Sequence, residues 1–118
     1  MSTPQELRDR TKKFAIRIVR LFQALPKSTE AQVMGKQLLR SGTSVAANYR
    51  AVCRARSKAE FIARIGVVAE EADESALWLE LLEETKVLAA GQLKDISQEA
   101  HALAAIFSAS QKTARGNR

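Results

Sequence analysis

The chain has 118 residues, enough for one domain with a hydrophobic core and too few for two domains of ordinary size. Its single cysteine, Cys53, excludes an internal disulfide, and no apolar run approaches the roughly 20 residues that a membrane-spanning helix needs. The first residues are charged where a secretory signal would need an apolar run, so we expect a soluble cytoplasmic protein.

The net charge of +6 is divided unevenly along the chain. Residues 1–58 contain 13 Lys and Arg against 3 Asp and Glu, whereas residues 59–118 contain 6 against 10, so the halves carry +10 and −4. A basic segment of this kind predicts an acidic partner, of which nucleic acid is the commonest. The alternative is attraction between the two halves, within one subunit or between subunits.

The first predicted helix covers about residues 4–25. Thr3 and Glu6 have the spacing of a capping box, and Pro26 ends the pattern. Apolar residues recur every three or four positions and predict one buried face. Away from that face lies a basic ridge of Arg10, Lys13, Arg17 and Arg20. This ridge is either a nucleic-acid contact or simply the solvated side of the helix.

The second predicted helix covers about residues 29–54, with Ser28 or Thr29 as its cap. Gly35 and Gly42 lie in a stripe of small residues, which predicts that a neighbouring helix approaches closely. Each glycine costs about 0.8–1.0 kcal/mol relative to alanine in a helix, so either close packing compensates or the helix bends at Gly42. A second basic ridge on this helix could join the first into one patch. Its members are Lys36, Arg40, Arg50 and Arg54.

The end of the second helix is crowded with cations, because Arg56 and Lys58 follow Arg50 and Arg54 closely. Like charges gathered at one point need an outside anion or good solvation. The alternative is a solvated helix end, where cations interact favourably with the helix dipole. Ser57 and Glu60 have the spacing of another capping box and therefore begin a third helix.

The third and fourth helices are predicted at about residues 58–86 and 92–113, and we expect Gly91 to end the third in a left-handed conformation. The third helix carries most of the acidic residues. Four helices joined by short connections make sequence neighbours antiparallel. We therefore predict an all-α fold in which residues 1–118 form one antiparallel up-and-down four-helix bundle.

Some apolar residues lie outside the predicted core stripes and indicate a contact between subunits. The alternative for Trp78 is that it caps the core of its own subunit. The predicted interface residues are Ile16, Val19, Leu77, Trp78 and Leu81.

Two linked motifs suggest a family. One is a Q-L-R-R-x-x-x-S-[IV]-x-x-N element and the other is an S-x-x-[ED]-[FY] helix start. Their counterparts here are Gln37, Leu38, Ser44, Val45 and Asn48, followed by Ser57, Glu60 and Phe61. On these residues, the run from Leu25 to Leu82 resembles the four-helix bundle proteins encoded in intervening sequences of bacterial 23S rRNA genes. The chain departs from the pattern at Leu39, and at Tyr49-Arg50-Ala51, which replaces a common I-A-E-G.

The resemblance implies an up-and-down bundle that assembles into a five-membered ring. A similar protein is the accessory subunit of a retroelement reverse transcriptase and contacts both the enzyme and nucleic acid through a basic surface. The resemblance establishes no activity for chains like this one.

Catalytic signals are weak, so we predict a non-enzymatic protein with no metal and no cofactor. The only histidine, His101, lies far along the chain from Cys53, which we interpret as a small buried apolar residue. Di-metal bundles need paired Glu-x-x-His motifs, whereas this chain has one Gln98-x-x-His101. The glycines are scattered and form no phosphate-binding loop. The glutamates of the third helix could bind a hard cation, but a solvated acidic face is the simpler interpretation.

The leading hypothesis is a homo-oligomer, in a ring that the resemblance makes pentameric, which binds RNA or DNA through phosphate contacts. The competing hypothesis is a scaffold or accessory subunit whose basic surface docks an acidic protein, or the acidic helix of its own neighbour. We expect no membrane partner. The predicted nucleic-acid-binding residues are Arg10, Lys13, Arg17, Arg20, Lys36, Arg40, Arg50, Arg54, Arg56 and Lys58.

Overall fold

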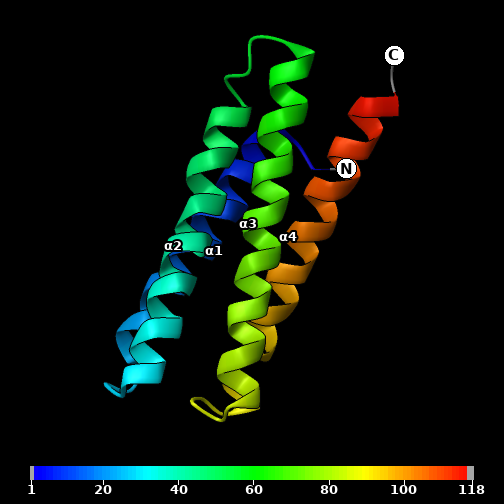
Figure 1. Cartoon of the computed structure of the whole chain (residues 1–118). Coiled ribbons are helices and arrows are strands. Elements are labelled where there is room, and N and C mark those ends of the chain that lie inside the picture. Colours follow the sequence, from blue (N-terminus) through cyan, green and yellow to red (C-terminus); the bar gives the residue numbers. More distant parts are fainter. Residues whose placement is uncertain (1, 117–118) are drawn as a thin grey trace.

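Four antiparallel helices form an up-and-down bundle in the computed structural model, which describes residues 2–116 apart from the side chain of Ala90 (Figure 1). The helices are α1 (Pro4–Ala24), α2 (Thr29–Val52), α3 (Lys58–Glu84) and α4 (Ala90–Gly116). Their Cα atoms extend over 49 × 21 × 19 Å. The predicted fold class is confirmed, and the described residues include no strand. None of these helices is long and apolar enough to cross a membrane.

The helix starts follow from local hydrogen bonds. The Thr3 hydroxyl accepts from the amide of Glu6 at 3.1 Å and the Glu6 carboxylate accepts from the amide of Thr3 at 3.3 Å, so the predicted capping box is present. At α3, the Ser57 hydroxyl accepts from the amide of Glu60 at 3.0 Å. The Glu60 carboxylate, however, accepts from the amide of Arg56 at 3.3 Å instead of reaching Ser57. The second capping box is therefore only half formed.

The end of α3 differs from the prediction. Lys86, with φ of 61°, is the left-handed residue there, whereas no described glycine has a positive φ and Gly91 lies in the first turn of α4. The amides of Lys86 and Val87 bond the carbonyls of Glu83 and Leu82, both at 3.0 Å, which is the Schellman arrangement. Val87 and its neighbour Leu88 pack against the core. This packing, which the residue types do not reveal, holds a lysine in a conformation that glycine usually adopts.

α4 accordingly begins two residues before the predicted start at 92 and continues three residues past the predicted end at 113. α2 ends at Val52, two residues before the predicted end at 54, and α3 ends at Glu84. Residues 1, 117 and 118 of the predicted domain lie outside the described chain.

The core contains large apolar side chains from all four helices, including Phe14, Ile18, Leu38, Ile65, Leu79, Leu103 and Phe107. The buried polar side chains are also hydrogen-bonded, as burial requires. The hydroxyl oxygens of Ser41 on α2 and Ser75 on α3 lie 2.9 Å apart and link the two helices inside the core.

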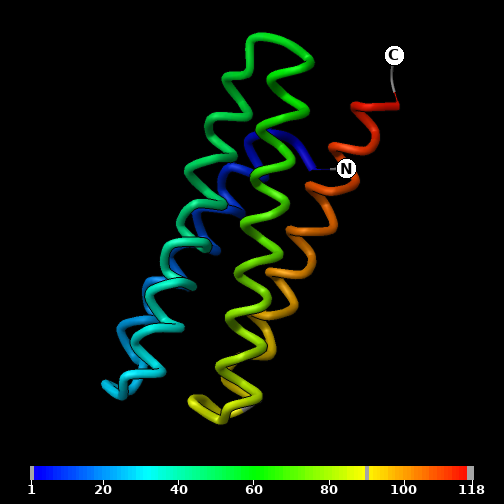
Figure 2. Tube along the Cα trace, viewed as in Figure 1, coloured from blue at the N-terminus to red at the C-terminus, as the bar shows by residue number. Residues whose placement is uncertain are grey.

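α1 and α2 approach each other closely at two glycines. A Cβ atom at Gly42 would lie 2.8 Å from Cγ1 of Ile18, and one at Gly35 would lie only 2.4 Å from Cδ1 of Leu25. The predicted close approach is therefore present. It brings the start of α1 alongside the end of α2 at one end of the bundle (Figure 2).

Sequence neighbours pack along their lengths, whereas α1 and α4 touch over a much shorter stretch. No Cα atom of α1 lies within 8 Å of one of α3, so these two helices lie diagonally across the bundle. Surfaces that point outward from these two helices therefore face different sides of the molecule.

Candidate functional site

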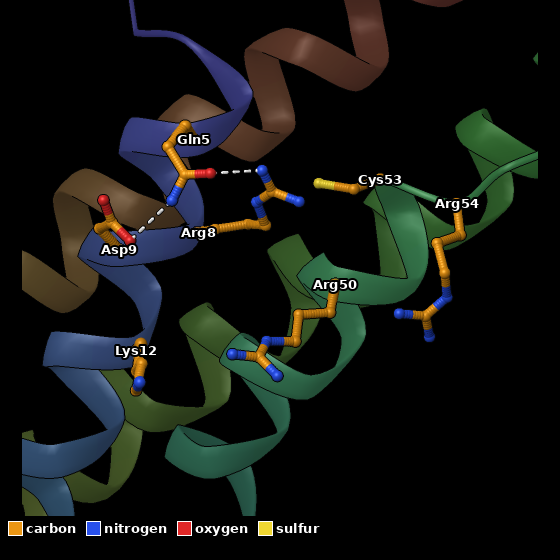
Figure 3. Close-up of a pocket in the computed structure, with 7 residues that line it drawn as sticks. All are labelled: Gln5, Arg8, Asp9, Lys12, Arg50, Cys53 and Arg54. Atoms are coloured by element: carbon orange, nitrogen blue, oxygen red, sulfur yellow. Dashed lines mark hydrogen bonds between the residues drawn. The ribbon is translucent and has the colours of Figure 1, made fainter.

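A recess of about 420 Å³ lies between the first turns of α1 and the last turns of α2 (Figure 3). Four of its lining residues are cationic and one is acidic. We call Arg8, Lys12, Arg50 and Arg54 the basic cluster. The other lining residues are Gln5, Asp9 and Cys53.

Helix geometry explains why these cations converge. Arg8 and Lys12 are four residues apart on α1 and therefore share one side of that helix, while Arg50 lies in the last turn of α2 and Arg54 in the turn that follows it. The close packing of α1 on α2 then sets the two pairs around the same space. Within residues 2–116, none of these four cations forms an ion pair with a carboxylate.

Arg8 is held in place by its own helix. Its Nη2 donates to Oε1 of Gln5 at 2.5 Å, and Nε2 of Gln5 donates to Oδ1 of Asp9 at 3.0 Å (Figure 3). The Arg8 side chain reaches from α1 toward Cys53 on α2 (Figure 3). The interpretation of Cys53 as a buried residue is wrong, because this thiol is exposed at the end of α2.

Arg10 is the member of the predicted ridge on α1 that contacts α4. Arg10 donates from Nε and Nη2 to the two carboxylate oxygens of Glu99, both at 2.7 Å. This hydrogen bonding, opposed by a smaller cost of burial, raises the pKa of Arg10. Lys13 and Arg20 are exposed and Arg17 is half-buried. Of the predicted ridge on the second helix, only Arg50 and Arg54 line the recess, and their cationic neighbours there on α1 are Arg8 and Lys12, not members of the first ridge.

On α2, Arg40 is occupied by acidic residues of α3. It donates to Glu74 and, at 2.9 Å, to Glu71, and these hydrogen bonds raise its pKa. Glu74 also accepts from Nε1 of Trp78 at 3.1 Å. The bond from Trp78, followed by the bond from Arg40, lowers the pKa of Glu74 against the opposing effect of burial. Lys36 is exposed on the same helix.

Beyond the end of α2, Arg56 and Lys58 do not line the recess. Nε of Arg56 lies 3.8 Å from Oε2 of Glu60, whose other oxygen accepts from Arg64 at 2.9 Å. Lys58 is exposed in the first turn of α3. Three of the ten predicted binding residues, Arg10, Arg40 and Arg56, thus have carboxylate partners within the bundle.

Tyr49 offers no platform for a base. Its side chain is 5% exposed, and its ring packs against Phe107 with the ring centroids 5.2 Å apart. Burial, followed by the neighbouring Cys53, raises the pKa of Tyr49 to about 12. Stacking of the kind used to hold single strands therefore has no exposed aromatic residue beside the basic cluster.

The predicted interface residues fall into two groups. Ile16, which is 44% exposed, and Val19, which is half-buried, lie on α1. Leu77, which is 47% exposed, lies on α3, where Trp78 and Leu81 are half-buried. Trp78 also packs against the core, in line with the alternative that it caps its own subunit. The sequence analysis missed Val33 on α2 and Val67 on α3, which are 57% and 43% exposed.

Arg8 and Lys12 were also missed as candidate binding residues. Their spacing of four was visible in the sequence, but the ridge at Arg10 was equally regular. Only the packing of α1 against α2 distinguishes the side of α1 that carries Arg8 and Lys12 from the side that carries Arg10.

In the part of the chain that the structure describes, no three His, Cys, Asp or Glu side chains are placed to hold a metal ion.

Comparison with known proteins adds the family. The model of the 23S rRNA-intervening sequence protein family matches residues 5–109, nearly the whole of the bundle. The chain belongs to this family. No curated protein matches.

A member of the S23 ribosomal protein family from Bacteroides thetaiotaomicron, known from a crystal structure and described as a protein with unknown function, has the same fold. The two chains are 35% identical with a TM-score of 0.84, and the match covers 92% of this chain and 97% of the other. The family resemblance seen in the sequence is confirmed.

Proposed function

We propose that the protein binds RNA or DNA through phosphate contacts made by the basic cluster and catalyses no reaction. The observation that carries the proposal is the contrast between its cations. Arg10, Arg40 and Arg56 have carboxylate partners, whereas the four cations of the basic cluster surround one recess without any among residues 2–116. A local excess of unpaired positive charge attracts a polyanion.

Such contacts position a nucleic acid and carry little sequence information. If each of the four cations meets one phosphate of a duplex, the logarithm of the binding constant falls with the logarithm of salt concentration with a slope of about −3 to −4. Affinity for an RNA hairpin then drops roughly a hundredfold between about 50 and 200 mM salt.

Fluorescence anisotropy with a labelled hairpin tests this proposal. Replacing Arg50 and Arg54 together with glutamate is expected to abolish binding at low salt. The matched control replaces Lys13 and Arg20, which are exposed on α1 and do not line the recess, and is expected to retain most of the affinity. No binding by the unaltered protein, an affinity independent of salt, or equal losses in the two variants contradicts the proposal.

We also propose that the protein is a homo-oligomer. Its exposed apolar residues Ile16 and Leu77 lie on α1 and α3, two helices that are diagonally opposed in the bundle. A contact between two different patches is head-to-tail, and such contacts close into rings when the rotation permits. A pentamer is the ring that the family resemblance implies. Sedimentation is expected to show an assembly that Leu77→Lys dissociates, whereas a monomeric unaltered protein contradicts this proposal.

A second candidate function is a scaffold whose basic cluster docks acidic protein, including a neighbouring copy. The observation that favours it is a recess of about 350 Å³ between α3 and α4, which is lined in part by Glu70 and Asp73. If this candidate is correct, the Arg50 and Arg54 variant loses its assembly and the unaltered protein does not bind RNA.

We place either activity in the cytoplasm, where an exposed single thiol such as Cys53 stays reduced.

A further inference from the structure

We propose that the recess at the basic cluster holds the terminal phosphate of a nucleic-acid strand, a phosphomonoester, in preference to an internal phosphodiester. This inference rests on the proposed function and narrows it to one end of the strand. It is carried by the number, origin and orientation of the charged groups around one space.

The charge balance favours the more highly charged phosphate. Four cations and the single carboxylate of Asp9 line the recess of about 420 Å³, so its lining residues carry a net charge of +3. An internal phosphodiester brings one negative charge, whereas a phosphomonoester brings about 1.5–2 near neutral pH and three terminal oxygens as acceptors. The terminal group therefore satisfies more of the available charge and more of the donors.

The cations also come from both sides of the recess, from α1 and from the end of α2. A recess between two helices can be lined in this way, whereas a ridge presents the side chains of one helix only. The guanidinium groups of Arg8 on α1 and Arg50 on α2 face the same space between the helices (Figure 3). Lys12 borders this space from α1, and Arg54 lines it from the turn after α2, although its guanidinium points away from α1 (Figure 3). Arginine presents a planar fork of donors that matches phosphate oxygens two at a time, while lysine adds a compact charge.

Arg8 is already oriented before any ligand arrives. Gln5 accepts from one of its terminal nitrogens at 2.5 Å and is itself bonded to Asp9 at 3.0 Å. Only one of the five N–H groups is used in this bond, so the others stay available to phosphate oxygens. A side chain held this way loses less conformational freedom on binding, which increases affinity.

The lining contains no aromatic platform on which a base could stack, and its Gln5 and Asp9 side chains are bonded to each other. None of its seven residues is aromatic, and the nearby Tyr49 is buried. Binding should therefore depend on the phosphate and not on the nucleotide that carries it.

The test compares three short single strands of one sequence that carry a 5′-phosphate, a 3′-phosphate or hydroxyls at both ends. Anisotropy with the unaltered protein is expected to give about tenfold tighter binding for at least one phosphorylated strand than for the strand without terminal phosphate. Adenosine and uridine monophosphates should displace that strand equally well, and the corresponding nucleosides should not.

Charge-conserving variants locate the site. Arg8→Lys and Arg50→Lys keep the charge but remove the planar fork, so each is expected to lose most of the tenfold preference. Arg20→Lys, on the other side of α1, is the matched control and should retain it.

The outcomes separate this inference from the proposed function. Equal binding of all three strands overturns the inference and leaves nucleic-acid binding intact. A preference that persists in both Arg8→Lys and Arg50→Lys overturns the assignment to this recess. Failure of every strand and of the hairpin to bind at low salt overturns the proposed function, and the inference with it.

Discussion

Gly42→Ala tests the helix contact on which the basic cluster depends. An alanine Cβ at this position would lie 2.8, 2.9 and 3.1 Å from Cγ1, Cγ2 and Cβ of Ile18. Ile18 is fully buried, and its branched side chain has few alternative rotamers, so the helices themselves have to move. Overpacking of this kind costs about 1–3 kcal/mol, and the better helix propensity of alanine returns about 1 kcal/mol.

The expected net loss for Gly42→Ala is therefore up to about 2 kcal/mol, which lowers Tm by up to about 8 °C in a domain of this size. Thermal unfolding followed by circular dichroism measures the change. Gly91→Ala is the matched control, because Gly91 is exposed in the first turn of α4 and has no such atom within 4 Å. That control should be as stable as the unaltered protein or more so. If Gly42→Ala behaves like Gly91→Ala, α1 and α2 do not pack as described.

Three further predictions concern stability. Burial of Tyr49 favours the neutral phenol and raises its pKa from 10 to about 12. The free energy of unfolding should therefore fall by about 2 kcal/mol as pH rises through this interval. Urea unfolding of Tyr49→Phe should not show that part of the loss. A double-mutant cycle on Arg10→Ala and Glu99→Ala should give a coupling of about 0.5–1 kcal/mol because the pair is partly exposed, whereas zero coupling contradicts the contact between α1 and α4. Ser57→Ala should cost about 1 kcal/mol through loss of the α3 cap, and unchanged unfolding by urea would show that the cap contributes nothing.

The bundle could be predicted from the sequence because its determinants are local. Apolar residues spaced by three and four identify the buried face of each helix, and short connections make the helices antiparallel. Gly42 correctly indicated a close approach, since a residue without Cβ is useful in a helix only where another group takes that space. The left-handed residue at Lys86 could not be predicted, because it depends on the packing of Val87 against the other helices.

The candidate site could be predicted only in part. Arg8 and Arg10 are two residues apart and project about 160° apart around α1, so they face different neighbours. Deciding which one faces α2 requires the handedness of the bundle, which periodicity does not give. The pairing of Arg10 with Glu99, 89 residues away, likewise depends on tertiary packing. Arg50 and Arg54 were identified because their crowding at the end of α2 is visible in the sequence.

The adjacent lysines Lys12 and Lys13 provide the most direct test of the central claim, that the cations around the recess are those that meet nucleic acid. Both are exposed on α1, but only Lys12 lines the recess. In anisotropy titrations of an RNA hairpin at low salt, we expect Lys12→Glu to weaken binding at least about tenfold and Lys13→Glu to change it by no more than about threefold. Equal losses in the two variants, or a larger loss for Lys13→Glu, would contradict the claim.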